Sequence, residues 1–162
     1  MSRVQIRIAV ESDAGPIALV LSEAFAEYRS QYTQMAFDAT CPSIEVILKR
    51  MSEGPVWVVE LDGGVAGTVA AVSKDDRLYI RGMAILPAAR GQAIGRLLLA
   101  TVQQHALDHG HQGMTLSTTP FLSRAIRLYE SFGFRRTEEG PQDLFATPLF
   151  TMEKALSGRA GG

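Results

Sequence analysis

The chain has 162 residues, of which 46% are hydrophobic and 20% charged, so its length suits one domain with a proper core. Its formal net charge of −1 argues against a nucleic-acid partner and against binding to a membrane surface, because both usually require a basic excess. The single cysteine, Cys41, cannot form an internal disulfide, and the sequence contains neither a bilayer-spanning apolar stretch nor a signal-peptide core. We therefore expect a cytoplasmic protein.

The first part of the chain predicts a strand and two helices. Alternating apolar residues predict a strand over 4–10, and apolar residues at helical spacing predict a helix over 11–25 with Ser12 or Asp13 as its cap. Ser43 is expected to cap a second, shorter helix. The apolar side of this second helix consists of Ile44, Ile47, Leu48 and Met51.

A meander of three strands comes next, followed by the order helix, strand, helix, strand. The predicted segments are strands over 55–62, 65–73 and 77–86, a helix over 94–109, a strand over 113–118, a helix over 119–134 and strand structure over 144–156. Gly82 interrupts the third strand of the meander, and a glycine there marks a bulge or a close backbone approach. This order predicts a single mixed α+β or α/β domain over 1–156, followed by a disordered tail over 157–162.

The stretch "RGQAIGRLLL", residues 90–99, places two glycines immediately before an apolar helix. The first amides of a helix lack internal partners and its dipole is positive at that end, so such a position binds phosphate. The small residues Gly91, Ala93 and Gly95 would let an anion approach the backbone. Arg90 and Arg96 add positive charge. An ordinary strand-to-helix turn is the alternative for this stretch taken alone.

Three stretches in order make the sequence resemble the GCN5-related N-acetyltransferase (GNAT) superfamily over about residues 54–156. The stretch "MAILPAARGQAIGRLLL" resembles the family's acetyl-CoA motif, "AIRLYESFGF" its late helix, and "FTMEKAL" its closing strand. The resemblance implies a mixed α/β fold of the acyl-CoA N-acyltransferase type. Its central, mostly antiparallel sheet would be splayed between the fourth and fifth strands and flanked by helices.

The resemblance also implies that acetyl-CoA is the co-substrate. Backbone amides of residues 92–96 would hold its pyrophosphate, and the backbone of Met83 and Ile85 would pair with the pantetheine arm in the opening of the sheet. The family's central motif glycine is Ala93 here, and Leu122 stands where the late helix often carries asparagine. The residues expected to contact coenzyme A are Met83, Ala84, Ile85, Arg90, Gly91, Gln92, Ala93, Ile94, Gly95, Arg96 and Ser123.

The implied reaction is direct acetyl transfer to a primary amine of a small-molecule or protein acceptor, through a tetrahedral intermediate. Tyr129 falls on the family's tyrosine position and is the candidate acid for the leaving thiolate, with a packed core tyrosine as the alternative. The main-chain amide near Met83 is the candidate oxyanion donor. For the acceptor site we expect Glu27, Tyr28 and Tyr32, and no single general base is assigned.

Several expectations about partners complete this prediction. A GNAT-like domain that binds coenzyme A as a sensor or assembly module is the alternative to an enzyme, and Leu122 favours it. His105 and His109 lie one helical turn apart without a visible matching ligand, so we expect a solvated helix end and no metal. A homodimer is a further expectation, because family members often dimerise and residues 144–156 offer strand edges.

Overall fold

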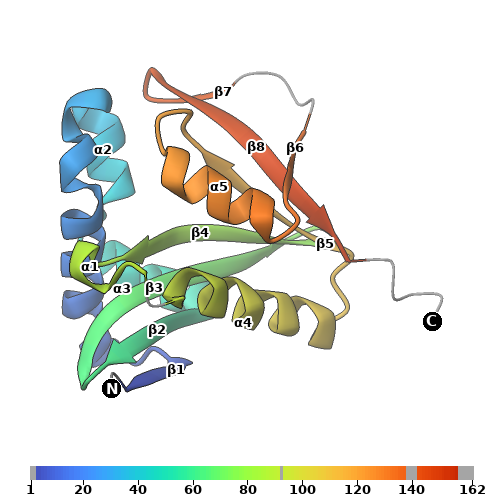
Figure 1. Ribbon diagram of the computed structural model, residues 1–162, viewed down its shortest axis with the longest axis horizontal. Helices are drawn as coiled ribbons and strands as arrows, with labels where there is room; N and C mark the ends of the chain where they lie inside the picture. The colour runs from blue at the N-terminus through green and yellow to red at the C-terminus, as the bar shows by residue number, and fades with distance from the viewer. Residues whose placement is uncertain (1–2, 92, 138–141, 157–162) are drawn as a thin grey trace.

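The computed structural model describes residues 3–91, 93–137 and 142–156. Its strands form a sheet of order β1-β2-β3-β4-β5-β8-β6, with β7 paired to β8 (Figure 1). The strands are β1 (Val4–Ile8), β2 (Val56–Leu61), β3 (Gly64–Lys74), β4 (Arg77–Ile85), β5 (Gly113–Thr118), β6 (Arg135–Arg136), β7 (Gln142–Leu144) and β8 (Thr147–Ala155). The α-helices are α1 (Ala14–Phe25), α2 (Gln34–Thr40), α3 (Ile44–Glu53), α4 (Ile94–Asp108) and α5 (Ser123–Ser131).

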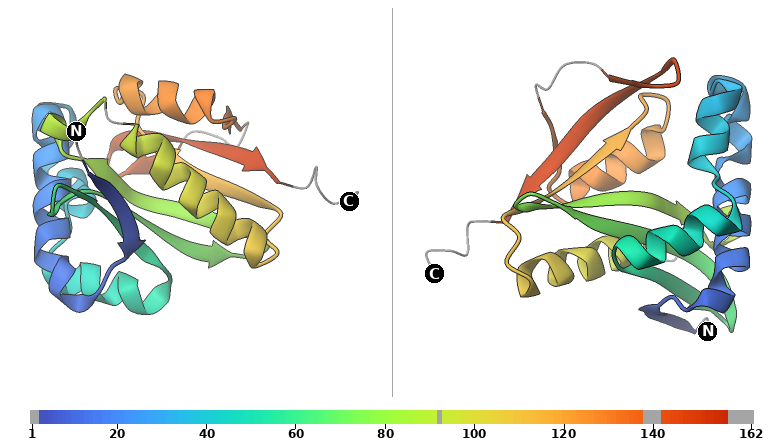
Figure 2. Two further views of the ribbon diagram at one scale, coloured as in Figure 1. Left: turned by 60° about the horizontal axis from the view of Figure 1, so that its bottom comes forward. Right: turned by 180° about the vertical axis from the view of Figure 1, so that it is seen from behind.

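Helices cover both faces of the sheet because β2 is apolar on both sides. Successive residues of a strand point to opposite faces. Trp57 and Val59 accordingly pack in one core with α4, whereas Val56 and Val58 pack in a second core with α1 and α3. Figure 2 shows α3 crossing the sheet in the right-hand view and α4 covering the other face in the left-hand view.

Strands β4 and β5 pair over only part of their length and then separate. Their parallel register begins with Arg77 opposite Gly113 and ends with Tyr79 opposite Thr115. Strand β4 nevertheless continues to Ile85. Figure 1 shows β5 and β8 rising away from β4 on the side nearest α1 and α2. The predicted splay between the fourth and fifth strands is therefore confirmed.

The bulge expected at Gly82 is present on β4. The register advances by two residues along β3 but by three along β4, so Gly82 and Met83 both lie opposite Val69. Gly82 has a φ of +61°, in the left-handed region that glycine adopts without a steric cost. A bulge bends its strand and increases the local twist, and this turns the end of β4 away from β5.

The N-terminus of α1 is not held by the predicted side-chain cap at Ser12 or Asp13. Asp13 precedes the helix without a capping hydrogen bond, and it accepts hydrogen bonds from the Val10 amide at 2.8 Å and from Arg7 Nη1 at 2.7 Å. Arg7 also lies 2.8 Å from a carboxylate oxygen of Glu60 on β2. The hydrogen bonds from Arg7 lower the pKa of the buried Asp13 carboxyl. This cluster joins β1, β2 and the start of α1.

Helix α3 is present as predicted, but its buried side is narrower than expected. Ser43 caps it by accepting a hydrogen bond of 3.3 Å from the Val46 amide. Ile47 is 1% exposed, whereas Ile44 is 46% and Leu48 is 37% exposed. The helix packs mainly against α1 and β3, which cover the middle of its apolar side and leave its edges in solvent.

The segment between the two predicted helices is more regular than its sequence indicates. It forms the 3₁₀ helix Ala26–Gln31 and α2, and Tyr32, Ala36 and Phe37 form a small third core there. Among the helices that the structure describes, none is long and apolar enough to cross a membrane. The predicted disordered tail lies outside the described residues.

Replacing Asp13 by asparagine should lower the free energy of unfolding by roughly 2 kcal/mol near neutral pH, because a buried carboxylate loses its charge-assisted hydrogen bonds. The pKa of Asp13 is lowered in the folded state, so its contribution is complete above the unfolded pKa of about 4 and is lost as the pH falls through the folded value. Urea unfolding across a pH series should show the two proteins converging under acid conditions. A stability difference that does not change with pH would contradict this ion pair.

Candidate active site

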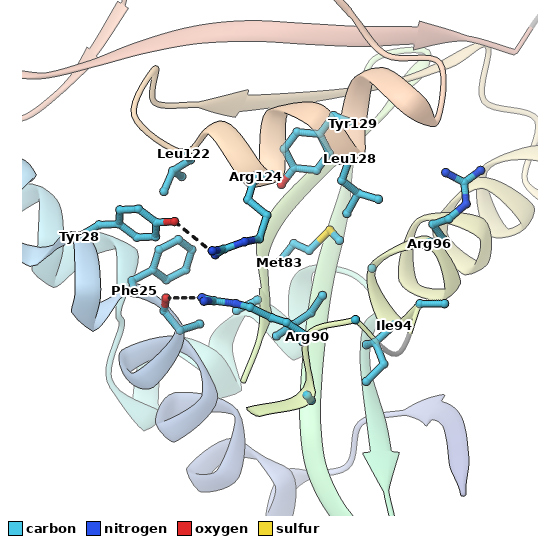
Figure 3. Close-up of a pocket in the computed structure, with 18 residues that line it drawn as sticks. Phe25, Tyr28, Met83, Arg90, Ile94, Arg96, Leu122, Arg124, Leu128 and Tyr129 are labelled. Atoms are coloured by element: carbon cyan, nitrogen blue, oxygen red, sulfur yellow. Dashed lines mark hydrogen bonds between the residues drawn. The ribbon is translucent and has the colours of Figure 1, made fainter. Parts of the chain in front are cut away.

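A cavity of about 310 Å³ lies in the opening between β4 and β5 (Figure 3). Its walls come from the end of α1, the bulged part of β4, the loop before α4, and α5. Figure 3 shows the guanidinium groups of Arg90 and Arg124 on the side of Tyr28 and Arg96 on the opposite side, with Met83 between them. The cavity therefore combines an apolar interior with a cationic rim.

The loop before α4 presents backbone amides to the first cavity. Gly91 and Ala93 both have positive φ, of +87° and +61°. The first bond inside α4 runs from the Leu97 amide to the Ala93 carbonyl at 3.2 Å, so the amides that precede Leu97 in the helix have no acceptor within it. A Cβ atom on Gly91 would meet nothing within 4 Å, which leaves this side of the loop open. Such a turn at a helix N-terminus is an anion-binding geometry.

Gly95 has a different structural role from Gly91. A Cβ atom at Gly95 would lie 2.5 Å from a methyl carbon of Leu128 on α5 and 3.4 Å from Ile85 on β4. The glycine therefore permits close packing of α4 against α5 and β4. Anion access to the backbone at these positions stays a prediction, and the open space for it lies at Gly91 rather than at Gly95.

The charged residues that line the first cavity within the described chain are all arginines. Arg90 forms an ion pair of 2.8 Å with Glu27, and Arg124 lies 4.0 Å from the same carboxylate. Arg124 also donates a hydrogen bond of 3.5 Å to the Tyr28 hydroxyl (Figure 3). Arg96 stands in the first turn of α4. One carboxylate does not balance three guanidinium groups, and guanidinium groups suit phosphate oxygens.

A second cavity, of about 390 Å³, lies on the other side of the same opening. Its walls come from β4, β5, α2, α3 and the β7–β8 hairpin. Four residues line both cavities: Phe25, Met83, Leu122 and Tyr129. Two molecules that enter from opposite sides would meet at these four residues, which we call the junction.

Tyr129 is the polar side chain of the junction. It is 8% exposed and packs edge-to-face on Phe134, with ring centroids 5.9 Å apart. Burial raises the pKa of Tyr129 to about 12, so its hydroxyl stays protonated near neutral pH. Figure 3 shows the hydroxyl directed into the cavity. The group can therefore donate a hydrogen bond or a proton to a ligand, but it is a poor base.

The sequence matches the acetyltransferase (GNAT) family over residues 19–134, which is more than half of the chain. The protein belongs to this family. The match confirms the family that the three sequence stretches predicted.

Individual relatives agree with this assignment. The chain is 31% identical to N-acetylaspartate synthetase of Mus musculus over 126 residues, which cover 76% of this chain but 42% of that protein. It thus spans less than half the length of this relative. It is 30% identical to the uncharacterized N-acetyltransferase YjgM of Escherichia coli over 143 residues, covering 85% of this chain and 84% of that protein.

A solved structure shows the same fold. The PaiA N-acetyltransferase of Thermoplasma acidophilum, in complex with coenzyme A, superimposes with a TM-score of 0.78 at 18% identity. The superposition covers 94% of this chain and 99% of that one. The mixed α/β architecture predicted for the chain is therefore confirmed.

Most residues predicted to contact coenzyme A gather at the first cavity. Its lining includes Met83, Ala84, Ile85, Arg90, Gly91, Ala93, Ile94, Gly95 and Arg96. Ser123 is an exposed residue at the start of α5 and lines neither cavity. Gln92 lies outside the described residues.

The three residues predicted for the acceptor site separate in the structure. Tyr32 lines the second cavity and Tyr28 lines the first. Glu27 is held at the rim by Arg90 and lines neither cavity. Burial raises the pKa of Tyr32 above the ordinary phenol value, so this hydroxyl too is protonated near neutral pH.

Two arginines of the second cavity were not among the predicted site residues. Arg50 lies in the last turn of α3, where a basic residue commonly interacts with the helix dipole in solvent. Only the fold brings it to the bulge. Arg81 directly precedes Gly82, so the predicted bulge was the signal that this residue lies near the site.

The histidines of α4 lie away from both cavities. His105 stacks on His109, with ring centroids 4.0 Å apart, and meets Trp57 edge-on at 5.4 Å. Within the part of the chain that the structure describes, no three or more His, Cys, Asp or Glu side chains form a group that could hold a metal ion.

Proposed function

We propose that the protein transfers an acetyl group from acetyl-CoA directly to a primary amine. The observation that carries this proposal is the junction. Met83 and Tyr129 line both cavities, so a thioester that enters through the first cavity meets an amine that enters through the second. When both reactants are held in contact in one complex, a bimolecular reaction becomes effectively unimolecular. This can supply a large part of the rate enhancement.

The first cavity suits three parts of coenzyme A: the pyrophosphate, the pantetheine arm and the end of that arm that carries the sulfur. The open turn at Gly91 and the first amides of α4 suit the pyrophosphate, as do Arg96 and the rim arginines. The edge of β4 beyond Tyr79 is not paired with β5, so backbone groups from Met83 to Ile85 are available to an extended pantetheine arm. Such an arm would lead to the junction.

The junction residues would act on the charges that develop during transfer. Bound acetyl-CoA supplies a thioester carbonyl that an amine attacks, giving a tetrahedral oxyanion and then an amide and a thiolate. The Met83 amide would donate a hydrogen bond to the oxyanion. The Tyr129 hydroxyl would donate to the sulfur and pass it a proton, and the proton released by the amine would restore the phenol.

The acceptor amine would enter in its neutral form. Among the described residues that line the two cavities there is no carboxylate, and the charged ones are arginines. Nearby positive charge lowers the pKa of an ammonium group and so favours the neutral amine. The name of the mouse relative refers to an N-acetylated amino acid, and this supports a small-molecule acceptor, with a protein amine as the alternative.

A sensor or assembly domain that binds coenzyme A without turnover is the second candidate. Leu122 favours it, because this apolar side chain lines both cavities where the family often carries asparagine. The two candidates share the first cavity and differ in what Tyr129 does.

Replacing Ala93 by aspartate should weaken acetyl-CoA binding about tenfold or more, because a carboxylate in the turn repels the pyrophosphate. Asparagine at the same position is the matched control, since both residues tolerate a positive φ and only aspartate adds charge. Titration calorimetry would measure both affinities. Equal weakening by the two substitutions, or none, would place the phosphates elsewhere.

Replacing Tyr129 by phenylalanine should lower kcat about a hundredfold while leaving acetyl-CoA affinity unchanged, because only the proton donor is removed. The assay is thiol release with the amine that gives the highest turnover in a screen. In the unmodified protein, the rate should not fall as the pH passes the ordinary phenol pKa of about 10, since the pKa of Tyr129 is raised to about 12. Unchanged turnover in the variant would make Tyr129 a packing residue.

A further inference from the structure

The charged side chains of the second cavity have one sign. Arg50 and Arg81 are the charged residues that line it within the described chain. Glu53 does not line the cavity, but its carboxylate pairs with Arg81 at 2.5 Å. Two guanidinium groups and one carboxylate leave a single positive charge uncompensated at this cavity.

Arg50 is not paired with an anion of the described chain, although the Glu53 carboxylate one turn along α3 attracts it and partly offsets the lowering of its pKa. Arg50 makes no hydrogen bond or ion pair with another residue that the structure describes, although burial and the neighbouring charge of Arg81 lower its pKa. Its Nη1 atom lies 2.9 Å from the position that a Cβ atom on Gly82 would take. The glycine of the bulge thus makes room for this guanidinium group, one residue from Met83.

Arg81 also has donor capacity left over. Its Nη2 atom donates to Glu53, but its Nε atom is buried and has no hydrogen-bond partner among the described residues. A buried N–H group without an acceptor is costly. The Arg81 side chain as a whole is 25% exposed and lines the cavity, so the accessible part of its guanidinium group faces a ligand there. Both arginines therefore carry guanidinium donors on the same cavity wall that no described residue accepts from.

We propose that Arg50 and Arg81 bind a carboxylate carried by the acceptor, so that the acceptor is an amine with a nearby carboxylate, as in an amino acid. This inference rests on the proposed acetyl transfer, and it names the substrate class. A guanidinium fork matches the two oxygens of a carboxylate. One carboxylate also neutralises the single uncompensated charge, whereas a phosphate monoester carries about −1.5 to −2.

The position of the two arginines would direct the amine of the acceptor toward the junction, where the thioester would lie. The bulge places Arg50 beside Gly82, and the next residue, Met83, belongs to the junction. A carboxylate held by Arg50 would therefore leave an amine a few bonds away facing the thioester. The same arginines would reject acceptors that are cationic and lack an acid group, because like charges in a cavity repel.

The test compares matched acceptors. Glycine, L-methionine, L-phenylalanine and L-glutamate are each paired with their α-carboxamide, and O-phosphoethanolamine is added as the phosphate probe. The preferred acid should exceed its amide about tenfold or more in kcat/KM, mainly through KM, because only the acid supplies the anion. Arg50→Gln should remove this preference and Arg50→Lys should retain part of it. Arg127→Gln, an exposed arginine outside both cavities, is the matched control and should retain it fully.

Binding of the same probes to the protein saturated with coenzyme A separates the two proposals. Amides acetylated as well as acids, or an acid preference that survives Arg50→Gln, would overturn the carboxylate site and leave acetyl transfer intact. A preference for O-phosphoethanolamine would mean that the arginines bind a phosphate group of the acceptor, and it would overturn the carboxylate assignment. No turnover with any amine would contradict the proposed function. In that case acid binding that is lost in Arg50→Gln still supports the site, and no acid binding overturns it.

Discussion

The separation of β4 from β5 after three residue pairs is the constraint on which the site depends. A sheet that continued to pair would hide the backbone of β4 in hydrogen bonds and would close the space between the strands. Because the bulge at Gly82 turns β4 away, its edge keeps backbone donors and acceptors that an extended ligand can use. The same opening creates two cavities, and Met83 and Tyr129 stand where they meet.

The charge around this opening follows from the fold as much as from composition. The chain as a whole has a net charge of −1, yet the charged residues that line the cavities in its described part are arginines. Cationic walls in a cleft attract anions and raise their local concentration. In the proposed reaction they would also favour the neutral form of an entering amine, because positive neighbours lower the pKa of an ammonium group. Under this proposal, binding of anionic groups and activation of the amine would depend on the same side chains.

Local sequence rules predicted the features that neighbouring residues decide. The bulge at Gly82 and the open turn before α4 follow from glycines in a strand and before a helix. The same rules did not predict the position of side chains that are held by residues far away in the sequence. Asp13 is held by an arginine of β1 instead of capping α1, and Glu27, expected at the acceptor, is held at the rim by Arg90. Arg50 was not among the predicted site residues, since only tertiary packing brings α3 to the bulge.

A crystal structure of the protein with coenzyme A and an amine acceptor would test most directly whether two ligands meet in the opening of the sheet. The geometry predicts the pyrophosphate on the first amides of α4, the pantetheine arm along β4, and the sulfur within hydrogen-bond distance of the Tyr129 hydroxyl. The acceptor should occupy the second cavity with its amine toward the sulfur. Coenzyme A bound outside the opening, or a sulfur remote from Tyr129, would contradict the proposed reaction site.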